Sequence, residues 1–158
     1  CVILAEIAAW AKDQGLSLYQ LLQKIYVEYG FSKEKGISVV KKGKSGAEEI
    51  EAMMKKFREN PLTEIAGSKV TYFYDYSTLK GKDYAENETV TLDMPTTSNV
   101  LQYFTEDNTK VSIRPSGTEP KIKFYCEVHS KVKSIDELPE AEKAAEEKIN
   151  QIKASLGI

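Results

Sequence analysis

One alternating segment near the C-terminal half of the chain constrains the fold most strongly. The apolar residues Ile122, Phe124, Cys126 and Val128 alternate there with Lys121, Lys123, Tyr125 and Glu127. Successive side chains of a β-strand point to opposite faces of a sheet, so this pattern predicts a half-buried strand with one polar face. We therefore expect a sheet that is covered by other elements on one side.

The remaining patterns predict where these covering elements lie. Further strands are indicated at 37–41, 70–75, 100–104 and 110–113, with a short one at 89–92 inside a polar connection over 77–99. A helix is expected after the capping-box sequence 45–48 and ends at Asn60-Pro61, and another begins near Pro139. The order strand, helix, several strands, helix predicts an α+β fold, with helices on one face of a mainly antiparallel sheet.

The first 30 residues predict a helical hairpin. Residues 2–13 are apolar nearly all round, so we expect a buried helix. Ser17 and Gln20 form a capping-box pattern at the start of a second helix, which Gly30 ends. The chain opens within an apolar run, so we expect it to be a C-terminal fragment whose first helix is cut. The polar residues 32–36 are expected to form a linker.

Composition excludes several classes of partner. The chain has 158 residues and a formal net charge of -2, which gives no reason to expect a nucleic-acid or membrane partner. The apolar run 2–10 is too short for a membrane span, which needs about 20 residues. Cys1 and Cys126 lack metal-ligand spacing and are expected to be reduced thiols, and His129 is the only histidine. No metal site and no catalytic residue is expected within the chain.

The run Arg114-Pro115-Ser116-Gly117-Thr118-Glu119-Pro120-Lys121 is the candidate binding site. Arg114 offers a planar fork of donors that matches phosphate oxygens, and Ser116 and Thr118 each offer a hydroxyl. Gly117 is expected to allow a tight turn and to bring backbone N–H groups close to an anion. An ordinary turn between two strands, rich in Pro, Ser and Gly, is the alternative.

Lys121 and Lys123 are secondary candidates for the same site. Both are expected on one side of their strand, next to the loop, where they would add positive potential for a phosphate. A solvent-facing pair that only improves solubility is the alternative.

The loop, followed by Ile122-Lys123-Phe124-Tyr125, resembles the C-terminal phosphate-binding loop of the α-D-phosphohexomutase superfamily, in its phosphoglucomutase/phosphomannomutase branch. The segments Arg58-Glu59-Asn60-Pro61, Glu64-Ile65-Ala66-Gly67 and Ser98-Asn99-Val100-Leu101 are similar to that branch as well. The resemblance implies a fourth domain with a four-stranded sheet and two helices, similar to the TATA-binding protein. It divides the chain into the end of a preceding domain at 1–31, a linker at 32–36 and a phosphate-binding domain at 37–158.

The resemblance also implies a function for the parent enzyme. A cytoplasmic phosphohexomutase would interconvert hexose 1-phosphate and hexose 6-phosphate through a phosphoserine, a hexose 1,6-bisphosphate intermediate and Mg²⁺. The family's Ser-His-Asn-Pro, Asp-x-Asp-x-Asp and Gly-Glu-x-Ser motifs do not occur in this sequence. The resemblance therefore implies that the reactive serine, the metal site and the loop that reads the sugar belong to missing N-terminal domains. It also implies that this chain binds the phosphate of the phosphosugar and is inactive alone.

Two other classes of function stay open at this point. The chain could be a stand-alone module that binds phospholigands, or a sheet domain that mediates protein association. Glucose, mannose, glucosamine and pentose phosphates also remain open as the preferred substrate.

Overall fold

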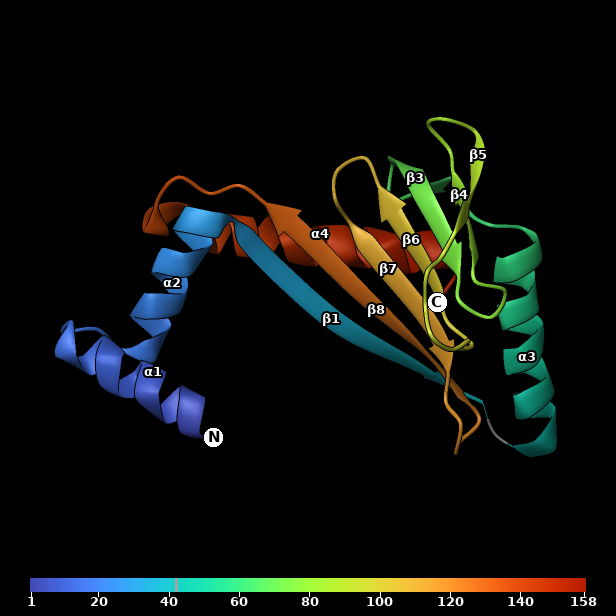
Figure 1. Cartoon of the computed structure of the whole chain (residues 1–158), viewed down its shortest axis with the longest axis horizontal. Coiled ribbons are helices and arrows are strands. Elements are labelled where there is room, and N and C mark those ends of the chain that lie inside the picture. Colours follow the sequence, from blue (N-terminus) through green and yellow to red (C-terminus); the bar gives the residue numbers. More distant parts are fainter. Residues whose placement is uncertain (42) are drawn as a thin grey trace. The chain divides into compact units, whose positions relative to one another are not determined.

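The computed structural model describes residues 1–41 and 43–158, apart from the side chain of Lys44. Helices and strands follow one another in this part of the chain as Figure 1 labels them: α1 (Val2–Asp13), α2 (Leu18–Tyr29), β1 (Phe31–Val40), α3 (Gly43–Glu59), β2 (Glu64–Ile65), β3 (Ser68–Asp75), β4 (Lys80–Asp83), β5 (Glu88–Thr91), β6 (Leu101–Thr105), β7 (Lys110–Pro115), β8 (Lys121–Ser130), η1 (Ile135–Glu137) and α4 (Leu138–Leu156). No helix within these described ranges is both long and apolar enough to cross a bilayer.

The chain divides into two compact units. The first comprises Cys1–Lys33 and His129–Glu146, and the second comprises Glu34–Val128 and Glu147–Ile158. Strands β1 and β8 and helix α4 therefore each contribute residues to both units.

The first unit contains the predicted helical hairpin. The Ser17 hydroxyl accepts from the Gln20 N–H at 3.2 Å, and the Gln20 side chain accepts from the Ser17 N–H at 2.8 Å. This confirms the capping box, and Gly30 ends α2 as predicted. Within this chain α1 is largely exposed, since Val2 and Ile3 are 74% and 73% exposed and Ala11 is its buried residue. The expected burial of α1 against a preceding domain stays a prediction.

The second unit is built on the sheet, whose strand order is β1-β8-β7-β6-β3-β4-β5, with β2 paired to β3. The pairs β7–β8, β6–β7, β3–β6 and β3–β4 are all antiparallel. The predicted α+β class is confirmed. The described residues form eight strands rather than the expected four, because β2, β4 and β5 join the five strands β1, β3, β6, β7 and β8.

The segment 32–36 is not a loop. It lies within β1, which begins at Phe31, so the residues expected to form a linker are part of a strand. The polar run Ser-Lys-Glu-Lys is typical of a loop, but β1 lies at the edge of the sheet. Charged residues are tolerated in an edge strand. The division between the two units falls between Lys33 and Glu34, inside this strand.

One face of the sheet carries the core of the second unit. The register places Phe73, Tyr103, Val111 and Cys126 in one cross-strand row and Leu101, Ile113 and Phe124 in the next. All seven are buried, and burial raises the pKa of the Cys126 thiol to about 11. This is the half-buried alternation that the 121–128 pattern predicted.

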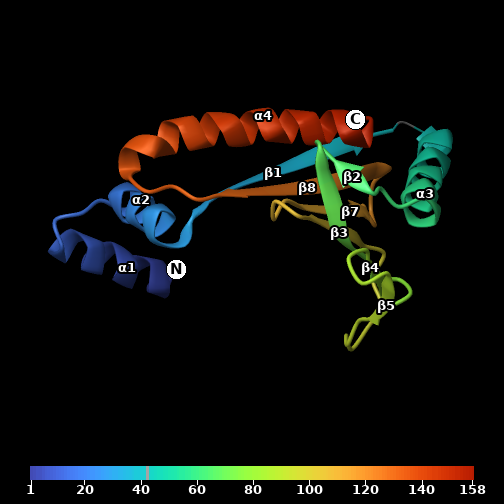
Figure 2. The same cartoon turned by 90° about the horizontal axis from the view of Figure 1, so that it is seen from above.

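Helices α3 and α4 close the core. The Phe57 ring of α3 meets Phe124 of β8 edge-to-face at 6.0 Å, and the Phe57 carbonyl accepts from the Tyr103 hydroxyl at 2.9 Å. In α4, Ile149 and Ile152 are fully buried, and Lys148 and Ser155 hydrogen-bond the Ala66 backbone. Figure 2 shows the last turns of α4 running along the sheet.

Helix α3 begins at Gly43, before the capping-box sequence 45–48 that is expected to start it. Ser45 therefore lies inside the helix and is not its N-cap. Gly46 is buried there, since a side chain at this position would meet the Lys41 backbone at 2.7 Å. The absence of a side chain at Gly46 lets α3 pack closely against the end of β1. A capping rule describes only neighbouring residues in the sequence, so it does not include this contact.

Candidate functional site

The β7–β8 loop is held at its base by backbone hydrogen bonds. The Ser116 N–H donates to the Lys121 carbonyl at 2.8 Å, and the Lys121 N–H donates to the Glu119 carbonyl at 2.7 Å. The Pro120 carbonyl accepts from the Lys41 N–H at 2.9 Å, which ties the loop to the end of β1. The tip 117–120 is therefore short and fixed at both ends, although its side chains are exposed.

Cationic side chains gather on one side of this loop. Arg114 of β7 pairs directly with Lys123 of β8, so the two side chains share a sheet face, and Lys121 lies on the same face of β8. We refer to Arg114, Lys121 and Lys123 as the basic cluster. It lies on the face opposite the buried core, because the neighbouring residues Ile113, Ile122 and Phe124 are buried.

Glu119 is the anion that faces this cluster in the structure. Its carboxylate forms an ion pair with the Lys121 ammonium. The hydrogen bond to Lys121 and the charge of that ammonium lower the pKa of Glu119, and Lys123 contributes to the same effect. The loop thus already binds one exposed anionic group at its cationic side.

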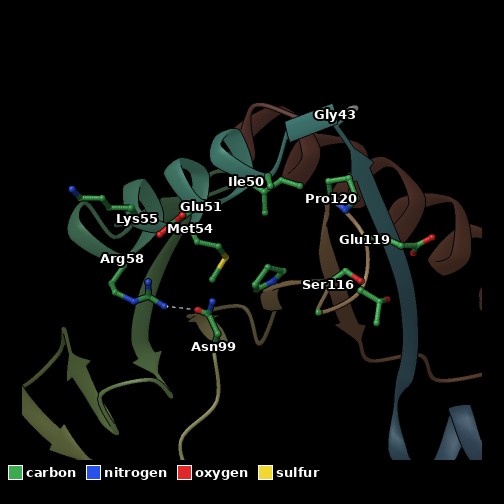
Figure 3. A pocket seen from close by; sticks show the side chains of 14 residues that line it. Gly43, Ile50, Glu51, Met54, Lys55, Arg58, Asn99, Ser116, Glu119 and Pro120 are labelled. Atoms are coloured by element: carbon green, nitrogen blue, oxygen red, sulfur yellow. Dashed lines mark hydrogen bonds between the residues drawn. The ribbon is translucent and has the colours of Figure 1, made fainter. Parts of the chain in front are cut away.

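The other side of the loop borders a hollow of about 750 Å³. We call it the α3 hollow, because α3 forms one wall and the loop the other (Figure 3). Ile50 and Met54 supply apolar surface, and Ser116, Gly117 and Thr118 line the loop side. Arg114, Lys121 and Lys123 are not among its lining residues. The structure therefore gathers the loop's hydroxyl residues along this hollow and places all three cations on the other face.

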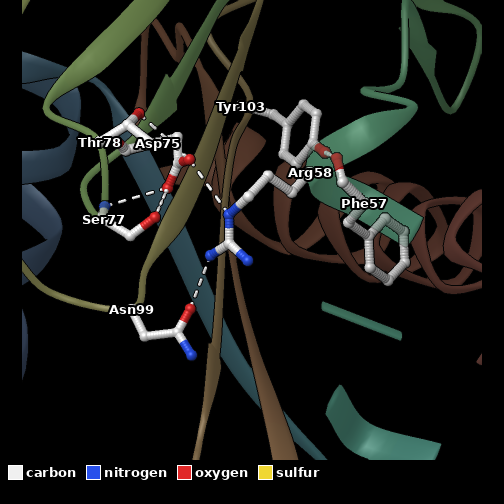
Figure 4. Close-up of polar contacts among 7 residues, drawn as sticks. All are labelled: Phe57, Arg58, Asp75, Ser77, Thr78, Asn99 and Tyr103. Atoms are coloured by element: carbon white, nitrogen blue, oxygen red, sulfur yellow. Dashed lines mark hydrogen bonds and ion pairs between the residues drawn. The ribbon is translucent and has the colours of Figure 1, made fainter. Parts of the chain in front are cut away.

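Arg58 and Asn99, which line the α3 hollow, belong to a polar network (Figure 4). The Arg58 Nε donates to the Asp75 carboxylate at 3.1 Å, and another guanidinium nitrogen donates to the Asn99 side-chain oxygen at 2.7 Å. The Asp75 carboxylate also accepts from the Ser77 N–H at 3.0 Å and from the Ser77 and Thr78 hydroxyls. Asp75 is 5% exposed, so its charge is stabilised by these donors and not by water.

The sequence interpretation did not identify this network as a structural unit. Arg58 and Asn99 appeared only within two short segments that resemble the phosphohexomutases. These two segments were the sequence signal for the network, since Arg58 and Asn99 line the same hollow and Arg58 donates a hydrogen bond to Asn99. The partner Asp75 could not have been found from spacing, because it sits in a strand 17 residues after Arg58.

Gly117 lies at the tip of the loop, and its φ is not positive. A side chain added there would meet nothing within 4 Å. The space above Gly117 is therefore open, and the expected role of this glycine at an anion stays a prediction.

Two further features bear on a second site: groups that could hold a metal ion, and the single histidine. Within residues 1–41 and 43–158, the structure has no group of three or more His, Cys, Asp and Glu residues that could hold a metal ion. His129 is exposed at the end of β8.

Comparison with known proteins identifies the family. The domain family described as "Phosphoglucomutase/phosphomannomutase, C-terminal domain" matches residues 37–145. The chain belongs to this family. The resemblance noted in the sequence is thereby confirmed.

Curated relatives of this family are longer proteins. "Phosphoglucomutase" of Staphylococcus haemolyticus (strain JCSC1435) is 37% identical over 118 residues, which cover 75% of this chain and 21% of the relative. "Phosphoglucomutase" of Staphylococcus saprophyticus is 33% identical over 124 residues, covering 78% and 22%. The chain thus spans about a fifth of the length of the curated relatives it matches.

One example of a similar solved structure is a phosphoglucomutase. The pp63/parafusin phosphoglucomutase from Paramecium, in its open form, aligns over 85% of this chain and 23% of its own length, with 14% identity and a TM-score of 0.38.

Proposed function

We propose that the β7–β8 loop binds the phosphate group of a hexose phosphate, and that the chain serves as the phosphate-binding domain of a phosphohexomutase. The observation that carries this proposal is the basic cluster beside a short, fixed loop. Arg114 and Lys123 lie side by side across two strands, and the exposed loop tip at the end of these strands offers backbone donors, with the hydroxyls of Ser116 and Thr118 on the side of the α3 hollow. Family membership makes a phosphosugar the natural ligand.

Each group has a distinct part in this proposal. The Arg114 guanidinium donates two parallel hydrogen bonds to phosphate oxygens, and Lys123 adds a second positive charge from the adjacent strand. Ser116 and Thr118 donate hydroxyl hydrogen bonds as their side chains turn toward the anion. Gly117 leaves the space above the tip empty, which allows the phosphate to approach the backbone. Phosphate displaces the Glu119 carboxylate from Lys121, because a dianion interacts more strongly with the three cations.

The chemical step belongs to the rest of the parent enzyme. We propose that the parent interconverts hexose 1-phosphate and hexose 6-phosphate through a hexose 1,6-bisphosphate, with glucose or mannose as the hexose. The residues described here do not fit a magnesium site, so we place the Mg²⁺ of the parent outside this chain. The nucleophile is placed there as well, since its motif is absent from this sequence.

The domain's own task is to hold the phosphate that does not react. The substrate and the product carry their phosphate at opposite ends of the sugar, so this site must accept both. A guanidinium and an ammonium recognise phosphate in either case. Binding energy from this remote group positions the reacting oxygen and thereby contributes to catalysis.

Calorimetric titration of the 158-residue chain tests the proposal. We expect glucose 1-phosphate and glucose 6-phosphate to bind with similar affinity, and glucose itself not to bind. Added salt should weaken the interaction because the contacts are ionic. Binding of glucose without its phosphate, or no binding of either phosphate, would contradict the proposal and favour a structural loop in a protein-association domain.

A further inference from the structure

A second hollow lies on the open face of the sheet, in the direct continuation of the basic cluster. It measures about 470 Å³, and its lining includes Gln102, Ser112, Tyr125 and Gly36. We call it the open-face hollow. The strands that form its floor, β1, β8, β7 and β6, are neighbours in the sheet (Figure 1).

Three polar side chains form the floor of this hollow, and we call them the polar row. Gln102, Ser112 and Tyr125 are direct cross-strand neighbours. The Gln102 Nε2 donates to the Ser112 Oγ at 3.0 Å, and the Gln102 Oε1 accepts from the Tyr76 hydroxyl at 2.8 Å. These bonds orient the Gln102 amide and leave the Ser112 O–H and the second Nε2 hydrogen able to donate to a ligand.

The two ends of the hollow differ in charge. At one end Lys110 and Glu127 form an ion pair and neutralise each other. At the other end the next pair on the same face is Arg114 and Lys123. Two residues along a strand correspond to about 7 Å, so Ser112 and Tyr125 are within reach of a group attached to a phosphate at the basic cluster.

Gly36 keeps the hollow open along its outer wall. A side chain added at Gly36 would lie 3.9 Å from the Tyr125 ring, which is ordinary van der Waals distance. Its backbone has no positive φ, so other residues fit this strand position without strain. A larger residue there would therefore occupy the hollow without distorting the sheet.

We infer that the open-face hollow binds the sugar ring of the hexose phosphate whose phosphate occupies the basic cluster. This inference rests on the proposed function and adds sugar-contacting residues to it. The Gln102 amide and the Ser112 hydroxyl hydrogen-bond sugar hydroxyls, and the Tyr125 ring provides a flat wall. Amide and hydroxyl groups both donate and accept, which suits a site that receives the sugar in two orientations.

Backbone and side-chain amide shifts in the NMR spectrum of the chain test this inference with two probes. Inorganic phosphate should shift the amides of residues 116–119 only. Glucose 1-phosphate should shift these amides and also the Gln102 side-chain amide and the amides of Ser112 and Tyr125. Sugar-phosphate shifts that stay confined to the loop would overturn the inference while leaving the proposed function intact.

Two variants separate the sugar contacts from the phosphate contacts. Gln102→Ala removes the amide, and Gly36→Val fills the hollow beside the Tyr125 ring while leaving Gln102 and Ser112 in place. Each should weaken glucose 1-phosphate binding about threefold to tenfold, the range expected for a lost hydrogen bond, and leave inorganic phosphate binding unchanged. Gln151→Ala, on the exposed surface of α4, is the matched control and should bind both probes like the wild type.

The outcomes distinguish failure of the sugar-site inference from failure of the proposed phosphate-binding function. If both variants bind glucose 1-phosphate like the wild type, the sugar lies elsewhere and the inference is wrong. If neither probe shifts the loop amides, the proposed function fails first, and the inference fails with it.

Discussion

Arg114 is the single residue on which phosphate binding should depend most. It is one of only two arginines in the chain, and the other, Arg58, is already engaged with Asp75 and Asn99. Lys123 and Lys121 supply charge near it, but an ammonium cannot form the paired hydrogen bonds of a guanidinium.

Arg114→Ala should weaken binding of glucose 1-phosphate at least about tenfold, because a charge-assisted hydrogen bond contributes roughly 1.5–3 kcal/mol. Arg114→Lys should restore only part of the affinity, since it keeps the charge and loses the fork. Calorimetric titration measures both, with Lys80→Ala, an exposed cation on β4, as the control for lost charge. Unchanged affinity in Arg114→Ala would remove Arg114 from the site.

Gly117 offers a test that separates binding from folding. Gly117→Ala should leave the free energy of unfolding unchanged within about 0.5 kcal/mol, because the added methyl group meets no atom within 4 Å and the backbone is not left-handed. The same methyl group should reduce phosphate affinity by occupying the approach to the loop. Urea unfolding and phosphate titration of one variant measure both effects. A destabilised variant would show that the glycine serves the turn itself.

At the scale of elements, the Arg58–Asp75–Asn99 network connects α3 to the sheet and to the segment before β6. Asp75 is nearly inaccessible to water, so its charge depends on the donors that surround it. Arg58 and Asn99 of this network also line the α3 hollow.

Arg58→Ala should destabilise the chain by about 2–3 kcal/mol, because it leaves a buried carboxylate without its ionic partner. The value lies below that of a fully buried pair, since the Arg58 side chain is partly exposed. Lys55→Ala, which breaks the exposed Lys55–Glu59 pair on the same helix, should cost less than about 0.5 kcal/mol. Equal losses in the two variants, measured by urea unfolding, would mean that Arg58 is only a surface residue.

Elements whose signal is local were predictable from the sequence, and elements defined by their partners were not. The capping box of Ser17 and Gln20 and the alternation at 121–128 each report on a single element, and both predictions are confirmed. Residues 32–36 are polar, as is common in a strand at the edge of a sheet. Strand β4 contains Gly81, and a side chain added there would meet the Phe73 carbonyl at 2.8 Å. Only the pairing of β4 with β3 explains that glycine.

The candidate site was likewise predictable only in part. The loop residues Ser116, Gly117 and Thr118 follow one another in sequence, and the structure keeps them together on one hollow. The pairing of Arg114 with Lys123 depends on strand register, and the polar row Gln102–Ser112–Tyr125 depends on three strands meeting. The sequence carries each of these residues without indicating that they share a face.

At the scale of the whole molecule, the chain covers about a fifth of the relatives it matches, and the family match begins at residue 37. We propose that residues 1–31 close a preceding domain of the parent and that residues 37–158 form the phosphate-binding domain. The exposed apolar residues of α1 and α2, such as Val2, Ile3 and Tyr29, fit that proposal.

The 158-residue chain should show no mutase activity. Its sequence lacks the phosphoserine and metal-binding motifs, and the described residues include no acidic cluster that could hold Mg²⁺. A coupled assay with glucose 1-phosphate, glucose 1,6-bisphosphate and magnesium measures this directly. Turnover that persists after removal of contaminating mutase would contradict the proposed division of labour between this domain and the rest of the parent.

The most direct test of the central claim is the amide chemical shift of Gly117 during titration with inorganic phosphate. The wild-type chain should show a saturable shift at Gly117 and at its neighbours Ser116 and Thr118. In the Arg114→Ala variant the same concentrations should produce little or no shift. A Gly117 amide that does not move in the wild type, or that moves equally in both proteins, would contradict the assignment of this loop and its basic cluster as a phosphate site.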